Sequence, residues 1–393
     1  MRKLPDKAKS IQPLPFAIYF YTVMLIAVVG LMVSVYLSYS HYRVYTDIGY
    51  KSFCAISKAI NCDTVSQSAY SIFLGLPVPL WGVVGYIFFL LLLLFAKTRD
   101  AENKRLWLLL FLISAGFTLY SVILAAISTF YIHSYCIMCI VLYAVNLLLL
   151  FYTRMIRSRF KSNGLIGSLR KDVQFLQSKR ATVLRTFTPL LVGIVLLWLF
   201  FPAYWQLDLP VLRSALNSGV TQDGHPWIGA ENPRLIITEY TDYKCFQCKK
   251  MHFFLRQLIA EHPDRIRLIH RNFPMDHSFN PIVKEPFHIG SGKMALMAIH
   301  AAKENKFWQM NDLLFEMAGE STVIDIRKLA ARLGMDAKTL AHSINDRNTR
   351  RSLQHDILSA LKLQINGTPA YVINGNVYLA QIPPEIIKTA LAD

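Results

Sequence analysis

Six cysteines are the residues of this chain best suited to redox chemistry. They form three pairs of near neighbours: Cys54 and Cys62, Cys136 and Cys139, and Cys245 and Cys248. Two thiols that lie close together can form, break and re-form a disulfide bond. If a C-x-x-C pair lies on a helix, both thiols are on one face. The pattern therefore points to thiol–disulfide exchange, provided that the surrounding elements bring the pairs within reach.

Five long apolar stretches are expected to cross a membrane. Each has about 17 or more residues with almost no charge, close to what a hydrocarbon core of about 30 Å requires. The stretches are 16–37, 78–96, 106–132, 136–152 and 187–205. The first follows a basic N-terminus, but it is too long for the apolar part of a signal peptide and no small-x-small site follows it. We therefore interpret it as a retained helix.

The distribution of the net charge of +17 indicates membrane topology and not nucleic-acid binding. Of the 42 Lys and Arg, 4 lie in residues 1–15, 4 in 97–105 and 9 in 154–185. Basic residues beside membrane helices mark the cytoplasmic side. We therefore expect an integral protein of the cell (inner) membrane with these three segments inside. All six cysteines and the chain after residue 205 would be outside, where disulfides are tolerated.

The region after the last apolar stretch has the pattern of a soluble α/β domain. Strands are predicted at 235–241 and 265–274, a mostly helical segment at 290–360, and a hairpin with an Asn-Gly turn at 367–380. The expected order of regions is a four-helix membrane unit (1–152), a basic connector with the fifth helix (153–205), a linker (206–234) and the α/β domain (235–393).

Cys245 and Cys248 lie between a predicted strand and a predicted helix. This places Cys245 at a helix N-terminus, where free N–H groups and the helix dipole favour a thiolate, the form that attacks in disulfide exchange. One alternative is a zinc site, because His252 completes a C-x2-C-x3-H pattern, but a fourth ligand would have to come from elsewhere. Another is an inert disulfide, which would close too short a loop to stabilise much. No metal site is expected.

The α/β domain resembles the thioredoxin superfamily, and within it the DsbA-like proteins with a helical insert. The resemblance rests on "YTDYKCFQC", on "KFWQMNDLLFE" and on Thr368-Pro369 before the last hairpin. It implies that Pro369 is cis and faces the cysteines, and that Thr368 binds an extended peptide substrate. Strongly oxidising relatives usually carry Pro and often His between the cysteines, whereas this chain has Phe246 and Gln247.

The membrane unit resembles the vitamin K epoxide reductase family, a four-helix bundle around a quinone. The resemblance rests on "CAISKAINC", "CDTVSQSAYSIFLGLPVPLWGVVGY" and "CIMCIVLYAVN". It implies that Cys139 faces the quinone, that Cys136 exchanges with the loop pair, and that Cys54 and Cys62 carry electrons from a thioredoxin-like partner. We expect the loop that holds this last pair to be mobile.

The same resemblance places two further residues in the quinone pocket. Ser68 matches a serine on the loop helix, and Tyr143 matches a tyrosine on the fourth helix. The alternatives are that Ser68 only caps a helix and that Tyr143 is only an aromatic residue at the membrane interface.

The expected fold is an all-α transmembrane four-helix bundle plus a fifth helix, followed by a thioredoxin-like α/β domain with a helical insertion. The expected function is a membrane thiol–disulfide oxidoreductase that oxidises thiols of secreted or periplasmic proteins and reduces a quinone, either ubiquinone or menaquinone. A disulfide isomerase, a reductive thiol relay or a vitamin K epoxide-type reductase is the alternative. From another class, a membrane-anchored chaperone or binding module with passive disulfides is also considered.

Overall fold

The computed structural model divides the chain into two units, residues 1–44 with 50–203 and residues 45–49 with 204–393. The structure describes residues 14–56, 59–97, 106–159, 164–207, 216–317 and 324–392. Much of the basic N-terminus and of the predicted inner loop 97–105 lies outside these ranges. Each unit is described by itself.

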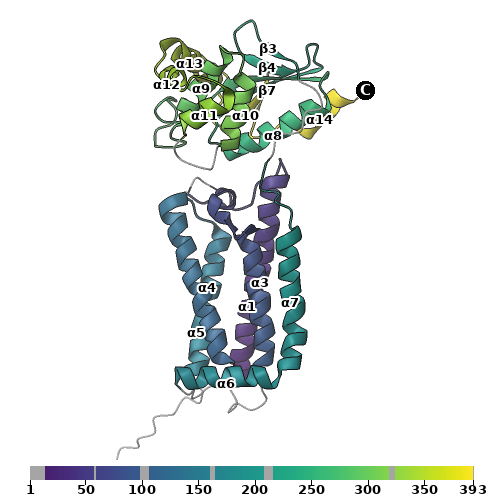
Figure 1. Cartoon of the computed structure of the whole chain (residues 1–393), viewed down its shortest axis with the longest axis vertical. Coiled ribbons are helices and arrows are strands. Elements are labelled where there is room, and N and C mark those ends of the chain that lie inside the picture. The colour runs from purple at the N-terminus through teal and green to yellow at the C-terminus, as the bar shows by residue number, and fades with distance from the viewer. Residues whose placement is uncertain are drawn as a thin grey trace, which may run out of the picture. The chain divides into compact units, whose positions relative to one another are not determined.

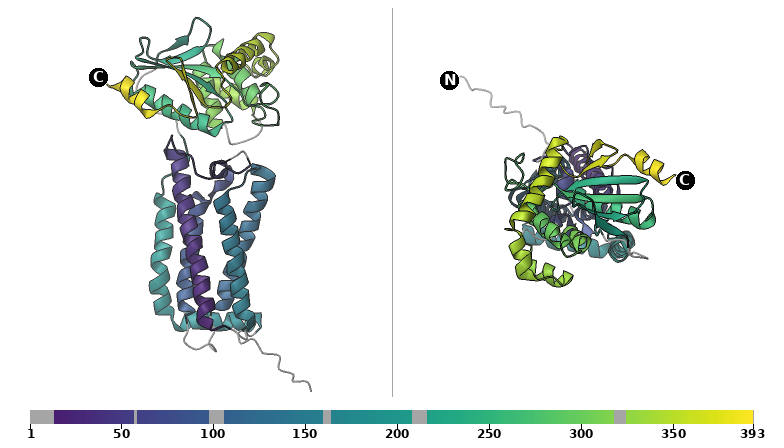
Figure 2. Two further views of the ribbon diagram at one scale, coloured as in Figure 1. Left: turned by 180° about the vertical axis from the view of Figure 1, so that it is seen from behind. Right: turned by 90° about the horizontal axis from the view of Figure 1, so that it is seen from above.

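The first unit is a bundle of long helices. They are α1 (Phe16–Thr46), α3 (Val78–Phe95), α4 (Trp107–Ile127, continued by a π-helical turn at Ser128–Ile132), α5 (Ile137–Arg159) and α7 (Arg180–Phe200). Shorter elements are α2 (Cys62–Ser66), a 3-10 turn (Ala69–Ser71), β1 (Ile72–Phe73), β2 (Leu76–Pro77) and α6 (Leu165–Ser178). Figure 2 shows α1, in purple, running along the bundle.

Within the described residues, five helices are long and apolar enough to cross a membrane, which confirms that prediction. The fifth, α7, begins at Arg180, seven residues before the expected start at 187. Arg180 and Arg185 extend it because arginine is a good helix former and can direct its charge away from apolar surroundings.

Small residues let α1 and α3 approach each other closely. A Cβ atom on Gly30 of α1 would lie 2.4 Å from the ring of Tyr86 on α3, and a Cβ atom on Gly82 of α3 would lie 2.8 Å from the hydroxyl of Ser34 on α1. Close backbone approach at small residues is a common way to pack membrane helices, which gain little from the hydrophobic effect. α7 adds Phe187, whose ring lies 5.2 Å from that of Phe88 on α3.

Part of the expected basic connector is helical. α6 lies across one end of the bundle (Figure 1), where the Asp172 carboxylate accepts a hydrogen bond of 2.7 Å from the backbone N–H of Leu106 at the start of α4. The N–H groups of a first helical turn lack partners within their own helix. Asp172 supplies a hydrogen-bond partner for one of these N–H groups and so connects α6 to α4.

The second unit is an α/β domain with a six-stranded sheet. Its strands are β3 (Ser218–Val220), β4 (Pro226–Gly229), β5 (Leu235–Thr241), β6 (Ile266–Asn272), β7 (Ala370–Ile373) and β8 (Asn376–Leu379), in the spatial order β3-β4-β6-β5-β7-β8. β5 and β6 are parallel, and the other neighbouring strands are antiparallel.

Helices connect and extend this sheet. α8 (Phe246–Glu261) links β5 to β6, and α14 (Pro384–Leu391) follows β8. The insert between β6 and β7 holds α9 (Ser291–Ala302), α10 (Phe307–Met317), α11 (Ile326–Leu333), α12 (Ala337–Ser343) and α13 (Arg347–Lys362). Aspartate side chains cap α11, α12 and α13, which explains where these helices begin. The expected fold class is confirmed.

One sequence expectation is wrong in part. Residues 206–234 were expected to be a linker, but β3 and β4 lie within this range and β4 pairs with β6. These strands are only three and four residues long, too short for an alternating pattern to stand out. Gly229 has a φ of +112°, and a Cβ atom there would lie 2.1 Å from the backbone oxygen of Ile266. Glycine therefore permits the close approach to β6.

Candidate functional site

Cys245 and Cys248 lie at the N-terminus of α8, as expected. Cys245 is the N-cap residue, and its Sγ accepts a hydrogen bond of 3.2 Å from the backbone N–H of Cys248. The Cys245 thiol also donates to the backbone oxygen of Thr368 at 3.5 Å. The Thr368–Pro369 peptide bond is cis, which confirms that prediction. The fold thus brings a segment 123 residues away along the chain to the first cysteine.

The two thiols of this pair have different acidities. Burial alone would raise the pKa of Cys245, but the hydrogen bond with the Cys248 thiol and the positive charge of His288 outweigh it, so the pKa of Cys245 is lowered. Burial and the neighbouring Cys245 sulfur raise the pKa of Cys248 well above its ordinary value. Because the thiolate is the attacking form, this asymmetry favours Cys245 over Cys248 as the attacking group.

His288 was not identified from the sequence, yet it contributes to the electrostatics of this site. Its Nδ1 lies 3.0 Å from a carboxylate oxygen of Asp242, which directly follows β5. Burial opposes protonation of His288, but the charge of Asp242 outweighs this and raises the pKa of His288. Nothing in the sequence marks this histidine, because it lies 43 residues after Cys245 in an irregular segment.

Asp242 connects His288 to the cysteine turn. Its carboxylate accepts hydrogen bonds from the backbone N–H of Lys244 at 2.6 Å and from the Ser291 hydroxyl at 2.9 Å, and its backbone oxygen accepts one from the N–H of Cys245 at 3.1 Å. Asp242 is fully buried. Asp242 therefore contacts the His288 ring through its side chain and the Cys245 backbone N–H through its own backbone oxygen.

The zinc alternative at the cysteine pair finds no support in the geometry. His252 Nε2 lies 2.8 Å from a carboxylate oxygen of Asp312, and His252 Nδ1 lies 3.4 Å from the Asn311 side-chain nitrogen. The His252 ring also stacks on Phe315 with a centroid distance of 4.6 Å. Both ring nitrogens therefore face the helical insert, and their contacts are with α10.

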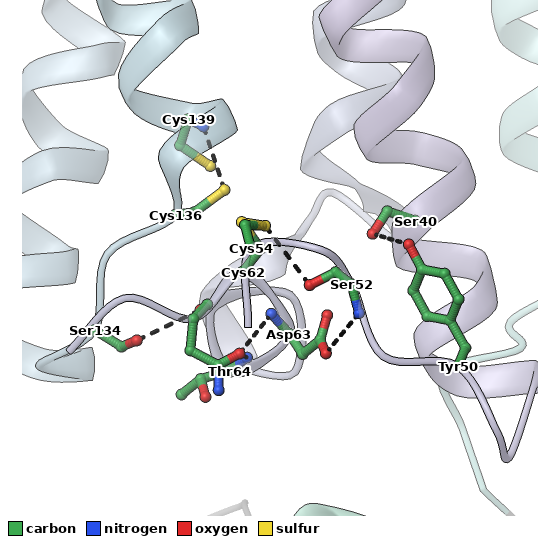
Figure 3. The surroundings of a disulfide bond; sticks show 11 residues. Ser40, Tyr50, Ser52, Cys54, Cys62, Asp63, Thr64, Ser134, Cys136 and Cys139 are labelled. Atoms are coloured by element: carbon green, nitrogen blue, oxygen red, sulfur yellow. Dashed lines mark hydrogen bonds between the residues drawn. A yellow bond between two sulfur atoms is a disulfide. The ribbon is translucent and has the colours of Figure 1, made fainter. Parts of the chain in front are cut away.

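In the membrane unit, three of the four cysteines are buried in one cluster. Cys54 and Cys62 form a disulfide with a Cα–Cα distance of 5.6 Å. Both pack with Cys136 and Leu37, while Cys139 borders the cluster. Figure 3 shows the disulfide next to Cys136, whose Sγ accepts a hydrogen bond of 3.2 Å from the backbone N–H of Cys139. The two membrane-unit pairs therefore meet, as the sequence analysis expected.

The loop that carries this disulfide is held by backbone pairing in the structure, and its expected mobility stays a prediction. Ile60 and Tyr135 form a parallel β-bridge. The N–H of Asn61 donates to the oxygen of Tyr135 at 3.0 Å, and the N–H of Tyr135 donates to the oxygen of Ala59 at 2.8 Å. As a result Cys54 is 0% exposed and Cys62 is 2% exposed. These backbone pairings connect segments more than 70 residues apart, which local sequence patterns do not reveal.

Next to Cys139 lies a cavity of about 310 Å³. Cys139 and Tyr143 of α5 line it together with residues of α1, α3 and α4. A smaller space of about 70 Å³ is lined by the same two residues and by Ser68 and Cys136. Small-molecule sites typically have volumes of about 300–1,000 Å³ and mostly apolar walls. The predicted quinone contacts Ser68 and Tyr143 are thus brought to one space beside Cys139.

The wall of the larger cavity also holds a polar group that sequence reasoning missed. Asn146 of α5 accepts a hydrogen bond of 2.7 Å from the Tyr86 hydroxyl and donates one of 2.9 Å to Ser121. All three residues line the cavity. An asparagine within an apolar helix was the available signal, because polar groups in membrane helices usually have partners or a function.

Ser68, the other predicted quinone contact, donates a hydrogen bond of 2.8 Å to the backbone oxygen of Val65.

Both units match known families. Residues 21–154 match the model of the vitamin K epoxide reductase family, and residues 221–393 match a thioredoxin model. Of solved structures, a thioredoxin-like oxidoreductase from Silicibacter pomeroyi DSS-3 is 23% identical, with a TM-score of 0.35, over 42% of this chain and 90% of that chain. BdbD from Bacillus subtilis is 22% identical, with a TM-score of 0.36, over 45% of this chain and 97% of that chain.

Curated proteins with similar segments include two bacterial antiporters. The Na(+)/H(+) antiporter NhaA 3 of Salinispora tropica is 25% identical over 163 residues, which are 42% of this chain and 24% of the antiporter. The Na(+)/H(+) antiporter NhaA of Herminiimonas arsenicoxydans is 24% identical over 184 residues, 45% of this chain and 27% of that protein. The chain therefore spans about a quarter of the length of these relatives.

Proposed function

We propose that this membrane thiol–disulfide oxidoreductase, in which a vitamin K epoxide reductase family domain (21–154) is joined to a thioredoxin domain (221–393), forms disulfide bonds in extracytoplasmic proteins and reduces a quinone. Two electrons and two protons leave a pair of substrate thiols and end on the quinone, which becomes a quinol. The basic segments of the chain support a topology with the thioredoxin domain and the six cysteines outside the cytoplasm.

The first step takes place at Cys245 and Cys248. With this pair oxidised, a substrate thiolate attacks the Cys245 sulfur and releases Cys248. The second substrate thiol then displaces Cys245, leaving a substrate disulfide and two reduced cysteines. The low pKa of Cys245 supports oxidation as the direction, because a stabilised thiolate stabilises the reduced form and makes the disulfide a stronger oxidant. Thr368 and Pro369 are the proposed peptide-binding residues beside this sulfur.

The next steps carry the electron pair to the membrane. Reduced Cys245 and Cys248 reduce the Cys54–Cys62 disulfide, and the resulting thiols reduce a disulfide between Cys136 and Cys139. Because the Cys54–Cys62 disulfide is buried beside Cys136, an external thiolate reaches it only after the loop opens. The backbone pairing of Ile60 with Tyr135 is the contact that this opening would break.

The last step takes place beside the cavity in the bundle. The dithiol of Cys136 and Cys139 is oxidised to a disulfide, and the quinone takes up two electrons and two protons. The observation that carries this proposal is that Cys139 lines the cavity with Tyr143 while Cys136 packs against the Cys54–Cys62 disulfide. Tyr143 and Ser68 are the proposed quinone contacts, and ubiquinone or menaquinone is the proposed acceptor.

A direct test uses the purified full-length chain in detergent with a reduced dithiol peptide and a soluble quinone analogue. The expected result is one quinol formed for each peptide disulfide, with both reactions absent from the Cys139→Ala variant. Peptide oxidation without quinol formation would contradict the quinone step. If neither substrate reacts and all six cysteines stay oxidised in cells, the disulfides are passive and the chain belongs to the binding-module class.

A further inference from the structure

Three potential metal ligands meet in the thioredoxin domain. His225 lies just before β4, while His355 and Asp356 are neighbours on α13. One ligand atom from each lies within 4.8 Å of the other two. Among the described residues, this is the cluster of histidine, cysteine and carboxylate side chains that is close enough together to hold a metal ion. We propose that His225, His355 and Asp356 bind a divalent transition-metal ion of the Zn²⁺ type, a site separate from the cysteine chemistry.

Local structure fixes the position of His225. A turn precedes it, in which the N–H of Gly224 donates to the oxygen of Thr221 at 2.9 Å. The Thr221 hydroxyl accepts a hydrogen bond of 3.0 Å from the His225 N–H, and the oxygen of His225 accepts one of 2.8 Å from the Thr221 N–H. The histidine backbone is thus held at both of its polar groups, which directs its ring toward α13.

Asp356 is oriented by contacts of the kind that surround metal ligands. Its Oδ2 accepts hydrogen bonds from the backbone N–H of Asn272 at 3.0 Å and from the Asn272 side chain at 3.3 Å. Asn272 is the last residue of β6. Both donors use one carboxylate oxygen, and the other, Oδ1, faces His225. Hydrogen bonds that hold a ligating carboxylate in this way are typical second-shell contacts.

Two buried atoms of the cluster have unmet bonding capacity. Asp356 Oδ1 and His225 Nε2 have no hydrogen-bond partner within the part of the chain that the structure describes. Their residues are 3% and 8% exposed. Buried polar atoms without partners are costly, and a metal ion bound at Asp356 Oδ1 would satisfy this carboxylate oxygen.

The spacing of the nearest atoms agrees with zinc coordination. His225 Nδ1 and Asp356 Oδ1 are 3.4 Å apart, longer than an ordinary N–H···O hydrogen bond. In a tetrahedral site with bonds of about 2.0–2.1 Å, two ligand atoms are about 3.3 Å apart. His355 is exposed, so its side chain can adjust to complete the set and leave the ion open to a fourth, solvent ligand.

The ligand types and nearby charges select the class of ion. Two imidazoles and one carboxylate favour zinc and its neighbours, whereas Ca²⁺ and Mg²⁺ prefer sites made of oxygen ligands. Arg271 lies nearby and opposes a cation, but its guanidinium pairs with the Asp223 carboxylate at 3.1 Å. An ion held here would link the β3–β4 hairpin to α13 and so brace the edge of the sheet against the helical insert.

The test measures Zn²⁺ binding to the full-length oxidised chain in detergent, with the cysteines kept as disulfides so that no thiolate competes. A chromogenic chelator reports affinity, and Co²⁺ absorption reports imidazole ligation. His355→Ala is the test variant, because His355 is the exposed ligand of the three and its removal should disturb folding least. His342→Ala on α12 removes another exposed histidine and is the matched control.

We expect about one Zn²⁺ per chain in the wild type and in His342→Ala. Affinity should fall about 100-fold or more in His355→Ala, since even the loss of a second-shell contact costs about 10–100-fold. Zn²⁺ should also raise the unfolding temperature of the wild type and the control, but not that of His355→Ala. Equal binding by His355→Ala and the wild type, or no specific binding by the wild type, would overturn the proposal and leave His225–Asp356 as a simple ion pair.

Discussion

The charge of His288 can be removed with little change in shape by His288→Gln. The side chain is 20% exposed, and Asp242 keeps its hydrogen bonds from Lys244 and Ser291, so the fold should tolerate the substitution. We expect the pKa of Cys245 to rise, because the positive charge of His288 is one of the causes that lower it. His288→Lys, which restores a cation, should reverse part of the change.

The size of the effect follows from the charges around the thiol. An opposite charge within about 4–6 Å shifts a pKa by about 1–3 units. Here the carboxylate of Asp242 counteracts the imidazolium at Cys245, so we expect the rise in the Cys245 pKa to be partial. For a two-electron couple, a tenfold change in the exchange equilibrium corresponds to about 30 mV. The variant should be the weaker oxidant.

The dependence on pH has a defined sign. Because folding lowers the pKa of Cys245, the thiolate stabilises the reduced fold fully above the unfolded value of about 8.5. This contribution is lost as the pH falls through the folded pKa. The oxidised fold has no thiolate and should show no such dependence. The reduced protein should therefore gain stability relative to the oxidised protein as the pH rises from the folded pKa of Cys245 to about 8.5, and His288→Gln should move the start of this gain to higher pH. Above about pH 8.5 the raised pKa of Cys248 acts in the opposite direction.

Thiolate absorbance against pH and equilibration with glutathione measure the two quantities in the full-length chain. His277→Ala is the matched control, because His277 lies in the same connection between β6 and α9 but pairs with Asp276, at 3.6 Å. If His288→Gln and His277→Ala leave the Cys245 pKa equally unchanged, His288 does not tune the nucleophile. The low pKa would then come from the helix N-terminus and Cys248 alone.

Three further predictions concern the order of the relay and its topology. Cys248→Ala should accumulate a mixed disulfide at Cys245, seen on non-reducing gels, whereas Cys245→Ala should not; equal trapping by both would reverse the nucleophile assignment. Cys139→Ala should abolish quinone reduction with any reductant, whereas Cys62→Ala should block electrons from the thioredoxin domain but keep some reduction by a small permeant dithiol. If Cys62→Ala loses quinone reduction equally with the thioredoxin domain and with the small dithiol, the loop is part of the quinone site and not a relay. Reporters at α6 and at Asn217 should lie on opposite sides of the membrane, and a common side would refute the five-crossing topology.

Local patterns were sufficient for much of this architecture. The membrane helices could be predicted because each needs only length and apolarity, which are properties of a continuous segment. The strand before Cys245 and the helix after it could be predicted from their periodicity, and with them the position of Cys245 at a helix N-terminus. The family motifs added the cis bond before Pro369.

Local sequence patterns could not predict contacts between distant segments. The β3–β4 hairpin was assigned to a linker because its strands are short and gain their partners from β6. The pairing of Ile60 with Tyr135 joins segments more than 70 residues apart, and Cys54 in the same loop is buried. His288 and the His225–His355–Asp356 cluster likewise depend on side chains that meet only after folding.

The groups available for redox chemistry can be recognised from local sequence alone: three cysteine pairs, one of them at the start of a helix and one at the start of a membrane span. Only the tertiary structure decided their environment, placing a cation and Asp242 around Cys245, a buried disulfide beside Cys136, and a cavity beside Cys139. The reason is physical. A thiol's type and local helix position are encoded in neighbouring residues, whereas its pKa, burial and access depend on charges and walls from remote segments.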